Sequence, residues 1–405
     1  MLEPSYLQHI AAGSEQIASE LHEYIVKQMV DRIMIRIGRG EDYLLTASDR
    51  WRIQTLQEAG YLLGDITKEL SRYTRKQEKE IREAMEEAGV KALAYDDKIY
   101  QNAGLSTVPL WESPQLVRLM ERNYLATLGE WSNYTRTTAT AAQRLFVKEV
   151  DFAYNKVMSG TVSYSQAVRE ALESIVNNGV HIEYPSGHRD TIETATARAV
   201  RTGISQAAGD ISIKRMEEMD WDIILVSAHI GARTGDGGEN PGNHFWWQGK
   251  FYSRSGNDKR FPPFSQTGYG TINGLSGVNC RHSFGSGDGM NNPYESIDTK
   301  ENARIEKLEQ RQRALERRIR KTKREVMGMQ EAVDKCEDES LKFELQQTLD
   351  RKSYLLQRQN KAYRDFCEEN ELRTLNERLR ITKWNREQAA KARGASRRYQ
   401  NAKGV

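Results

Sequence analysis

The eight prolines of this 405-residue chain leave three long stretches without any proline. These stretches cover residues 5–108, 115–184 and 294–405. Proline removes a backbone donor and clashes with the preceding helical turn, so it breaks helix interiors. Its absence over such lengths favours long helices. We therefore predict a mainly α protein in which only residues between the second and third stretches depart from helix.

The first two stretches predict an elongated helical N-terminal region, residues 1–180. Apolar residues recur there at helical spacing, beginning with Ile17, Leu21, Ile25, Met29 and Ile33. The run Thr46–Asp49 offers an N-cap for a following helix. Residues 114–179 predict three or four helices, with glycines 160 and 179 as C-terminal caps. Flat helical faces of this kind suit attachment to another protein.

The third stretch predicts a basic helical hairpin or coiled coil over residues 291–396, followed by a basic tail, 397–405. Glu, Lys, Arg, Gln and Leu dominate it, and it has an interrupted apolar seam. The polar run at 334–340 is the predicted turn between two arms. The seam residues are Leu308, Leu315, Ile319, Val326, Leu341, Leu345, Leu349 and Leu356.

Charge is distributed unequally along the chain. Residues 301–405 hold 27 Lys and Arg against 18 Asp and Glu, whereas the whole chain has a formal net charge of only +3. A basic segment suits an anionic partner such as double-stranded DNA, although charges on a helix can also form a solvated face. The densest basic run predicts non-specific phosphate contact. Its residues are Arg317, Arg318, Arg320, Lys321, Lys323 and Arg324.

Residues 181–290 differ in composition and predict a small α+β module. Glycines and aromatics concentrate there. The run 223–227 reads as a short buried strand that delivers His229 and Arg233 to a loop, and 249–256 reads as a second strand. The stretch from Gly268 to Gly285 is too rich in glycine for either regular element.

Cysteine usage and the N-terminus bear on the cellular compartment. Cys280, Cys336 and Cys367 form neither a C-x-x-C pair nor a dense disulfide framework, which favours a reducing compartment. The first residues lack the basic and apolar regions of a signal peptide, and no apolar run reaches membrane-spanning length. We expect a soluble protein that is synthesised in the cytoplasm.

Several ordered motifs give the chain a resemblance to a known family. VSAHIGART at 226–234, NHFWWQGKFY at 243–252 and GYGTINGLSGVNCRHSFGSGDG at 268–289 follow one another. Similar runs lie at 62–73, 179–208 and 310–325. Together they resemble the phage minor capsid protein 2 family of tailed phages, which is itself similar to the head-morphogenesis domain of phage Mu.

The resemblance implies a structural minor protein of the phage head, without enzymatic activity. Its expected place is inside the virion, near the portal vertex and facing the packaged DNA, with a role in head assembly and in DNA packaging or ejection. The expected partners are the portal protein, the major capsid protein as a second candidate, and double-stranded DNA without sequence preference. No membrane partner is expected. A cellular DNA-binding coiled-coil protein remains an alternative.

The run SGVNCRHSFG at 276–285 allows three interpretations. Histidines 229, 244 and 282 with Cys280 are acceptable zinc ligands, but a C-x-H spacing is not a familiar zinc pattern. A metal-dependent nuclease or transferase centred on these residues and Arg233 would need a general base beside metal carboxylates, and no such pair accompanies them.

We favour the third interpretation, a folded structural motif without catalytic residues, metal or cofactor. Glycines 268, 270, 274 and 277 permit left-handed backbone, Asn279 caps a turn, and the Arg281 guanidinium binds several carbonyl or carboxylate oxygens. Its members are His229, Arg233, His244, Trp247, Gly249, Gly268, Gly270, Gly277, Asn279, Cys280, Arg281 and His282.

Overall fold

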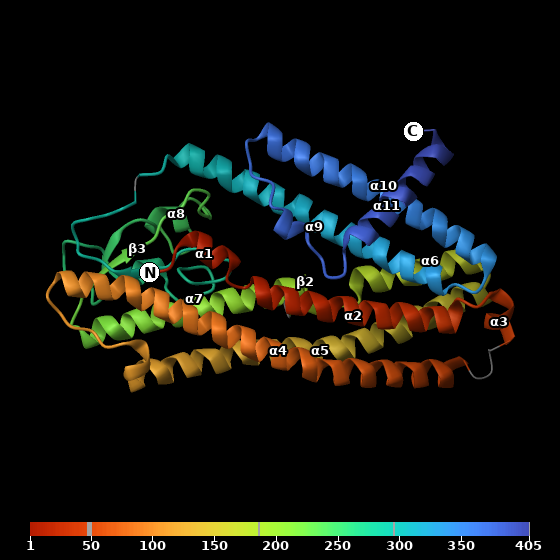
Figure 1. Ribbon diagram of the computed structural model, residues 1–405, viewed down its shortest axis with the longest axis horizontal. Helices are drawn as coiled ribbons and strands as arrows, with labels where there is room; N and C mark the ends of the chain where they lie inside the picture. The colour runs from red at the N-terminus through yellow and green to blue at the C-terminus, as the bar shows by residue number, and fades with distance from the viewer. Residues whose placement is uncertain (47–50, 185–186, 295, 405) are drawn as a thin grey trace. The chain divides into compact units, whose positions relative to one another are not determined.

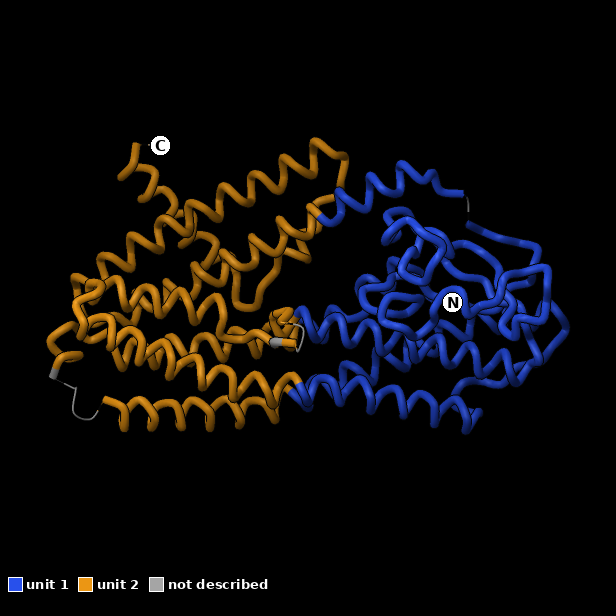
Figure 2. Tube along the Cα trace, turned by 180° about the vertical axis from the view of Figure 1, so that it is seen from behind, with its two compact units in different colours: residues 1–15, 74–133, 194–310 blue, residues 16–73, 134–193, 311–405 orange. Residues whose placement is uncertain are grey.

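The computed structural model describes residues 1–46, 51–184, 187–294 and 296–404 and is mainly α, with two small antiparallel sheets (Figure 1). The predicted fold class is confirmed. Two compact units each collect three separate stretches of the chain (Figure 2). Unit 1 comprises residues 1–15, 74–133 and 194–310, and unit 2 comprises residues 16–73, 134–193 and 311–405. These units do not follow the sequential boundaries predicted from composition.

The first half of the chain is built from seven helices among the described residues. They are α1 (Pro4–His9), α2 (Ala12–Ile37), α3 (Glu41–Thr46), α4 (Trp51–Asn102), α5 (Pro114–Met158), α6 (Tyr164–Asn178) and α7 (Ile192–Glu218). A short 3-10 turn, η2 (Leu110–Glu112), follows α4. Helices α4 and α5 contribute residues to both units. The predicted N-cap at 46–49 falls largely on residues 47–50, outside the described part of the chain.

Residues 114–179 form two helices rather than the predicted three or four. Helix α5 runs unbroken for 45 residues because it has no proline after its first residue, Pro114, and its one interior glycine, Gly129, costs only about 1 kcal/mol. It ends at Gly160, whose φ of 67° is the left-handed conformation expected of a C-terminal cap. Gly179 does cap α6, but with a right-handed φ of −64°.

The core of unit 1 lies among α1, α4, α5 and α7. Buried apolar side chains from these helices pack together, among them Leu7, Met85, Leu116 and Ile204. A second cluster of buried residues, including Trp247, Tyr252 and Phe284, belongs to the module that follows α7.

The module after α7 contains a three-stranded antiparallel sheet in the order β4-β3-β5. Strand β3 (Ile223–Val226) pairs with β4 (Phe251–Ser253) on one side and with β5 (Phe284–Ser286) on the other. The first two strands confirm the predictions at 223–227 and 249–256. The third was missed because it lies in a glycine-rich run.

A buried carboxylate joins this sheet to the helices of unit 1. Asp96 of α4 accepts hydrogen bonds from Ser212 Oγ on α7 at 2.6 Å and from the Ser286 backbone N–H of β5 at 2.8 Å. The Tyr100 hydroxyl lies 2.6 Å from Ser286 Oγ. These contacts fix the end of β5, and with it the segment that carries Cys280 and His282.

Most of the predicted helical hairpin belongs to unit 2, while residues 299–310 of its first helix belong to unit 1. Helices α9 (Thr299–Lys335) and α10 (Glu339–Glu369) are separated by a turn at 336–338, inside the predicted interval. Asp338 caps α10 by accepting a hydrogen bond from the Leu341 N–H at 2.7 Å. The α10 seam leucines 341, 345, 349 and 356 are all buried.

The C-terminal residues differ from the predicted basic tail. After a 3-10 turn, η4 (Asn376–Leu379), helix α11 (Arg386–Lys403) packs along α10. Tyr354 and Tyr399 stack with ring centroids 5.1 Å apart, and Arg398 donates to both carboxylate oxygens of Asp350. Residues 397–403 are therefore part of a docked helix.

Unit 2 also contains a small two-stranded sheet. A short hairpin in unit 2, β1 (His181–Glu183) and β2 (Arg189–Thr191), was not predicted because three-residue strands carry little pattern. No helix in the described part of the chain is long and apolar enough to span a lipid bilayer.

Candidate functional site

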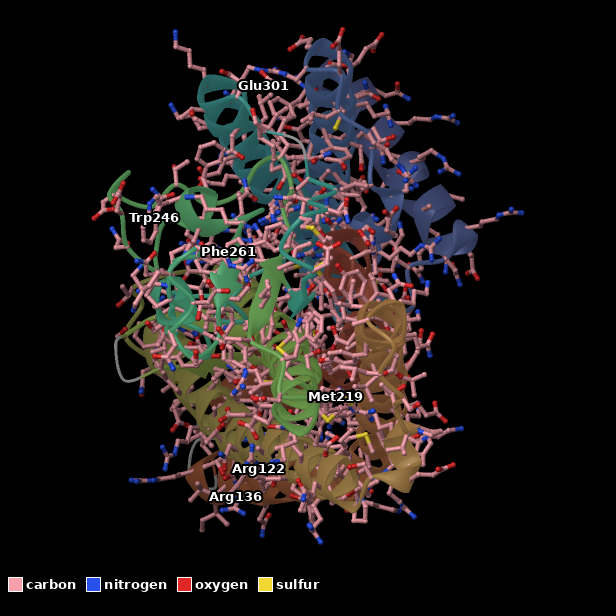
Figure 3. All side chains as sticks on the ribbon, turned by 90° about the vertical axis from the view of Figure 1, so that its left-hand side faces the viewer. Arg122, Arg136, Met219, Trp246, Phe261 and Glu301 are labelled. Atoms are coloured by element: carbon pink, nitrogen blue, oxygen red, sulfur yellow. The ribbon has the colours of Figure 1, made fainter. Side chains whose placement is uncertain are left out.

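The candidate site lies in the module of unit 1 between β3 and β5 (Figure 1). Strand β3 leads into the loop that carries His229, as predicted. The single-turn helix α8 (His244–Trp247) begins where the Asn243 side chain accepts a hydrogen bond from the Trp246 N–H at 3.1 Å. Trp246 and Phe261, both from this module, are labelled in Figure 3.

Three side chains that are distant in sequence come together in this module. The ligand-type atoms of His244, Cys280 and His282 all lie within 4.8 Å of one another. Each of the three residues is no more than 2% exposed. His244 lies 36 residues before Cys280 in the sequence but beside it in the fold.

Hydrogen bonds determine which nitrogen of each imidazole carries the proton. His244 Nε2 lies 2.8 Å from the Asn273 carbonyl oxygen, and His282 Nε2 lies 2.9 Å from the Gln248 side-chain oxygen. Because both oxygens can only accept, both Nε2 atoms donate. In the neutral rings the lone pair therefore resides on Nδ1, and for His282 this atom is 3.7 Å from Cys280 Sγ.

Aromatic rings hold the cluster in place. His229 stacks on His282 with ring centroids 4.3 Å apart. Trp247 lies 4.6 Å from the His244 ring and 4.8 Å from the His282 ring. Its indole N–H donates to the Pro241 carbonyl at 3.0 Å, so the indole is itself fixed. The rings therefore have little freedom to turn.

Burial sets the protonation states of the cluster. It raises the pKa of the Cys280 thiol to about 11 and lowers that of His244 to about 4. Burial also lowers the pKa of His282, with the charges of neighbouring histidines acting in the same direction. At neutral pH Cys280 is thus a buried thiol rather than a thiolate, and a nucleophilic role like that of a cysteine hydrolase does not suit it.

The two arginines of the motif bind backbone and carboxylate oxygens. Arg233 donates to the Val278 carbonyl at 2.9 Å. Arg281 donates to Glu309 Oε2 of α9 at 2.9 Å, and more distantly to the Gly231 carbonyl and to the Gln8 side chain. This is the forked contact expected of Arg281. Both arginines connect loops of the module to one another or to neighbouring helices.

The backbone of the motif agrees with the glycine prediction at two positions out of four, because Gly268 and Gly270 have positive φ whereas Gly274 and Gly277 do not. Glycines 249, 268 and 270 have positive φ, and so does Asn279 at 59°. Gly277 is not in the left-handed region. It is needed for a different reason, because a Cβ at this position would meet the carbonyl oxygens of Thr271, Ile272 and Gly274.

The predicted DNA-contacting run of α9 is only partly exposed. Arg324 is 7% exposed and pairs with Glu23 at 2.9 Å and with Glu193 at 2.7 Å. This is a correction, because a buried and doubly paired guanidinium cannot meet phosphate.

Two more basic residues of the predicted DNA-contacting run donate hydrogen bonds to backbone carbonyl oxygens. Arg320 donates to the Arg378 carbonyl and Lys323 to the Leu379 carbonyl, each at 2.6 Å. Burial lowers the pKa of Lys323 to about 8. Of the predicted six residues, Arg317, Arg318 and Lys321 are exposed.

Sequence reasoning missed a basic groove between α10 and α11. It has a volume of about 240 Å³ and no carboxylate among the described residues that line it. The basic residues come from two helices that are separated in sequence by η4, so no single run reveals them. The lining consists of Tyr354, Gln357, Arg358, Lys361, Arg393, Ser396, Arg397 and Gln400.

Comparison with known proteins gives a family and one relative. The sequence model of the family described as "Phage minor capsid protein 2" matches residues 2–368. A protein of Lactococcus phage LL-H named "Structural protein" is 22% identical over 341 residues, which cover 78% of this chain and 88% of the relative. No solved structure matches the chain.

Proposed function

The chain belongs to the phage minor capsid protein 2 family, and from this premise we propose that it is a structural component of a tailed-phage head, positioned at the portal vertex and facing the packaged DNA. In this role it acts in head assembly and in DNA packaging or ejection. Its partners are the portal protein, double-stranded DNA and, as a second protein contact, the major capsid protein.

One observation carries this proposal, namely the extent of the family match. It runs from residue 2 to residue 368, through stretches of both compact units and through the whole loop module. The match therefore includes the helices as well as the His and Cys motif. The relative named "Structural protein" matches over a similar length.

The geometry of the motif supports a structural role for it. Cys280 and His282 are inaccessible, and Arg281 connects the loop to α9. A catalytic site needs groups that reach a substrate. The contacts of this motif run instead to carbonyl oxygens, a glutamate and neighbouring rings of the same unit.

Exposed basic residues of unit 2 support contact with DNA. Arg317, Arg318 and Lys321 lie on α9, and Arg358, Lys361, Arg393 and Arg397 line the α10–α11 groove. Lys361 already pairs with Asp365 at 2.6 Å, so its contribution to phosphate binding is reduced. The contact requires no base reading, because sugar-phosphate backbone attracts such residues whatever the sequence.

Binding to recombinant portal protein tests the position at the vertex. The full chain is expected to be retained by immobilised portal rings and, in purified heads, to be located by electron microscopy at one vertex. Major capsid protein shells that lack portal serve as the control. Even decoration of those shells without retention by portal would contradict the assignment to the vertex, while leaving a structural role in the head intact.

A further inference from the structure

We propose that His244, Cys280 and His282 bind one zinc ion that fastens α8 to the segment preceding β5. The proposal concerns the stability of unit 1 and does not depend on where the protein sits in a phage head. The C-x-H spacing favoured a motif without metal. The structure nevertheless brings the three residues close together, and this closeness is the reason for proposing a metal.

The distances within the cluster suit a tetrahedral ion. Zinc binds sulfur at about 2.3 Å and imidazole nitrogen at about 2.0–2.1 Å, so tetrahedral ligand atoms lie roughly 3.3–3.6 Å apart. Cys280 Sγ and His282 Nδ1 are already 3.7 Å apart, and all three ligand-type atoms lie within 4.8 Å. Bringing the set to ligand distance therefore requires a contraction of about 1.5 Å at most.

The hydrogen bonds of the two imidazoles match those that orient zinc-bound histidines. Such histidines characteristically donate their second ring N–H to a carbonyl or carboxylate oxygen, which fixes the tautomer and the ring orientation. His244 Nε2 donates to the Asn273 carbonyl, and His282 Nε2 donates to Gln248. Gln248 Oε1 also accepts from the His229 backbone N–H at 3.0 Å, so the amide is itself held in place.

The donor set selects the metal. One thiolate and two imidazoles suit zinc, whereas magnesium and calcium require oxygen ligands. In the described part of the chain no carboxylate joins the three residues. Binding exchanges the Cys280 S–H proton for the metal, and the proton leaves to solvent, so the ion and its thiolate carry a net charge of +1. A tetrahedral ion takes its fourth ligand from outside this set.

The burial of the three residues assigns the ion a structural role. Exposures of 2% or less leave no approach for a substrate. His244 belongs to α8, whereas Cys280 and His282 lie just before β5, so one ion adds a cross-link between two segments that are otherwise joined by side-chain packing and by the hydrogen bond from His282 to Gln248. Such a link stabilises a module that has short strands and many glycine turns.

Metal analysis of the full-length protein tests the proposal. Protein purified under reducing conditions is expected to hold about one equivalent of zinc. After exchange into cobalt, the spectrum should show sulfur-to-cobalt charge transfer and the intense visible bands of a tetrahedral site. Chelator should lower the thermal midpoint of the zinc-loaded protein.

Two variants distinguish this site from adventitious binding. Cys280→Ser is expected to lose the metal, the charge-transfer band and the response to chelator. Cys367→Ser, the same change at another buried cysteine in α10, should keep all three. Retention of the metal by folded Cys280→Ser would overturn the proposal.

The wild-type chain provides a further test that does not require a folded variant. If folded wild-type protein takes up no zinc and gives cobalt only the weak spectrum of an octahedral aqueous ion, the cluster is a packing motif alone. The proposal then fails, while the place of the chain in a phage head is unaffected.

Discussion

At the residue scale, the loop before Cys280 depends on the absence of a single side chain. Gly277 packs against three backbone carbonyl oxygens, and none of them belongs to a flexible side chain that could move aside. Gly270 presents the complementary case, because its φ is 76° but a Cβ there would meet nothing within 4 Å. At Gly277 there is no room for a side chain, whereas at Gly270 the left-handed backbone favours glycine.

We expect Gly277→Ala to destabilise unit 1 more than Gly270→Ala. The second change should cost about 1 kcal/mol, the usual penalty of a left-handed alanine. The first must displace backbone and should cost more, on the order of 2–4 kcal/mol. Urea unfolding of both variants measures the difference. Equal losses would contradict the close packing of the carbonyl oxygens around Gly277.

At the element scale, buried ion pairs hold α9 in place. They involve Arg324, which the sequence pattern predicted as a contact to DNA phosphate. Arg324 lies between Glu23 of α2 and Glu193 of α7, and His22 Nδ1 lies 3.0 Å from Glu193. Burial opposes ionisation of Glu193, but the charges of Arg324 and His22 hold its pKa well below the usual range. One face of α9 is therefore occupied by ion pairs within the protein.

Removing the buried guanidinium should be costly. Arg324→Ala leaves Glu23 and Glu193 buried without their partner, and breaking such a pair costs about 3–5 kcal/mol in unfolding free energy. Arg318→Ala, on the exposed part of the same helix, should change stability by less than about 0.5 kcal/mol. Denaturant unfolding of the two variants makes the comparison. A mild effect of Arg324→Ala would show that this network contributes little to unit 2.

The β1–β2 hairpin contains a histidine that makes stability depend on pH. Burial, with the charges of His22 and Arg189, lowers the pKa of His181 to about 4. An unfolded histidine titrates near 6.5, so the unfolded chain binds more protons between these values. Neutral His181 thus contributes stability that is fully present above about pH 6.5 and is lost as the pH falls towards 4.

We expect His181→Gln to flatten this dependence. Relative to wild type, the variant should gain about 1–2 kcal/mol as the pH falls from 6.5 to 4.5, after allowance for the partial exposure of the imidazole. Unfolding free energies measured at matched pH values provide the comparison. A difference between the two proteins that stays constant over this range would argue against a depressed pKa.

At the scale of the whole molecule, the distribution of charge bears on the proposed contact with DNA. The excess of nine positive charges after residue 300 is partly offset by acidic residues from outside this segment, as in the pairs of Arg324 with Glu23 and Glu193. Exposed basic residues on α9 and in the α10–α11 groove remain available to bind an external anion.

Binding of the full chain to double-stranded DNA should be weak, non-specific and strongly salt-dependent. If about four to six phosphates are neutralised, the log–log salt slope is roughly −4 to −5, so affinity falls a few hundredfold or more between about 50 and 200 mM salt. The double change Arg393→Gln and Arg397→Gln should make the slope less negative by about one to two. Fluorescence anisotropy over a salt series measures both proteins.

As a control for folding, the double variant should unfold like the wild-type protein, because both arginines are exposed. No binding by the full chain at about 50 mM salt would remove DNA from the proposed partners. An unchanged slope in the double variant would instead move the contact from the groove to another surface.

Elements that depend on neighbouring residues can be predicted from the sequence alone. Proline-free lengths and apolar spacing predict α9, α10 and the turn between them, and a short apolar run predicts β3, because helix and strand periods act over a few residues. The continuity of α5 was harder to predict, since no local pattern in residues 114–158 distinguishes one helix of 45 residues from two shorter ones.

Which distant residues meet depends on how the whole chain folds. Glu23 and Arg324 are 301 positions apart, yet their pairing turns a predicted DNA contact into a buried ion pair. His244 reaches Cys280 and His282 because β3 and β5 pair side by side and α8 folds back onto the same module. Burial and partner choice arise from contacts across the chain, and no local pattern of charge or spacing encodes them.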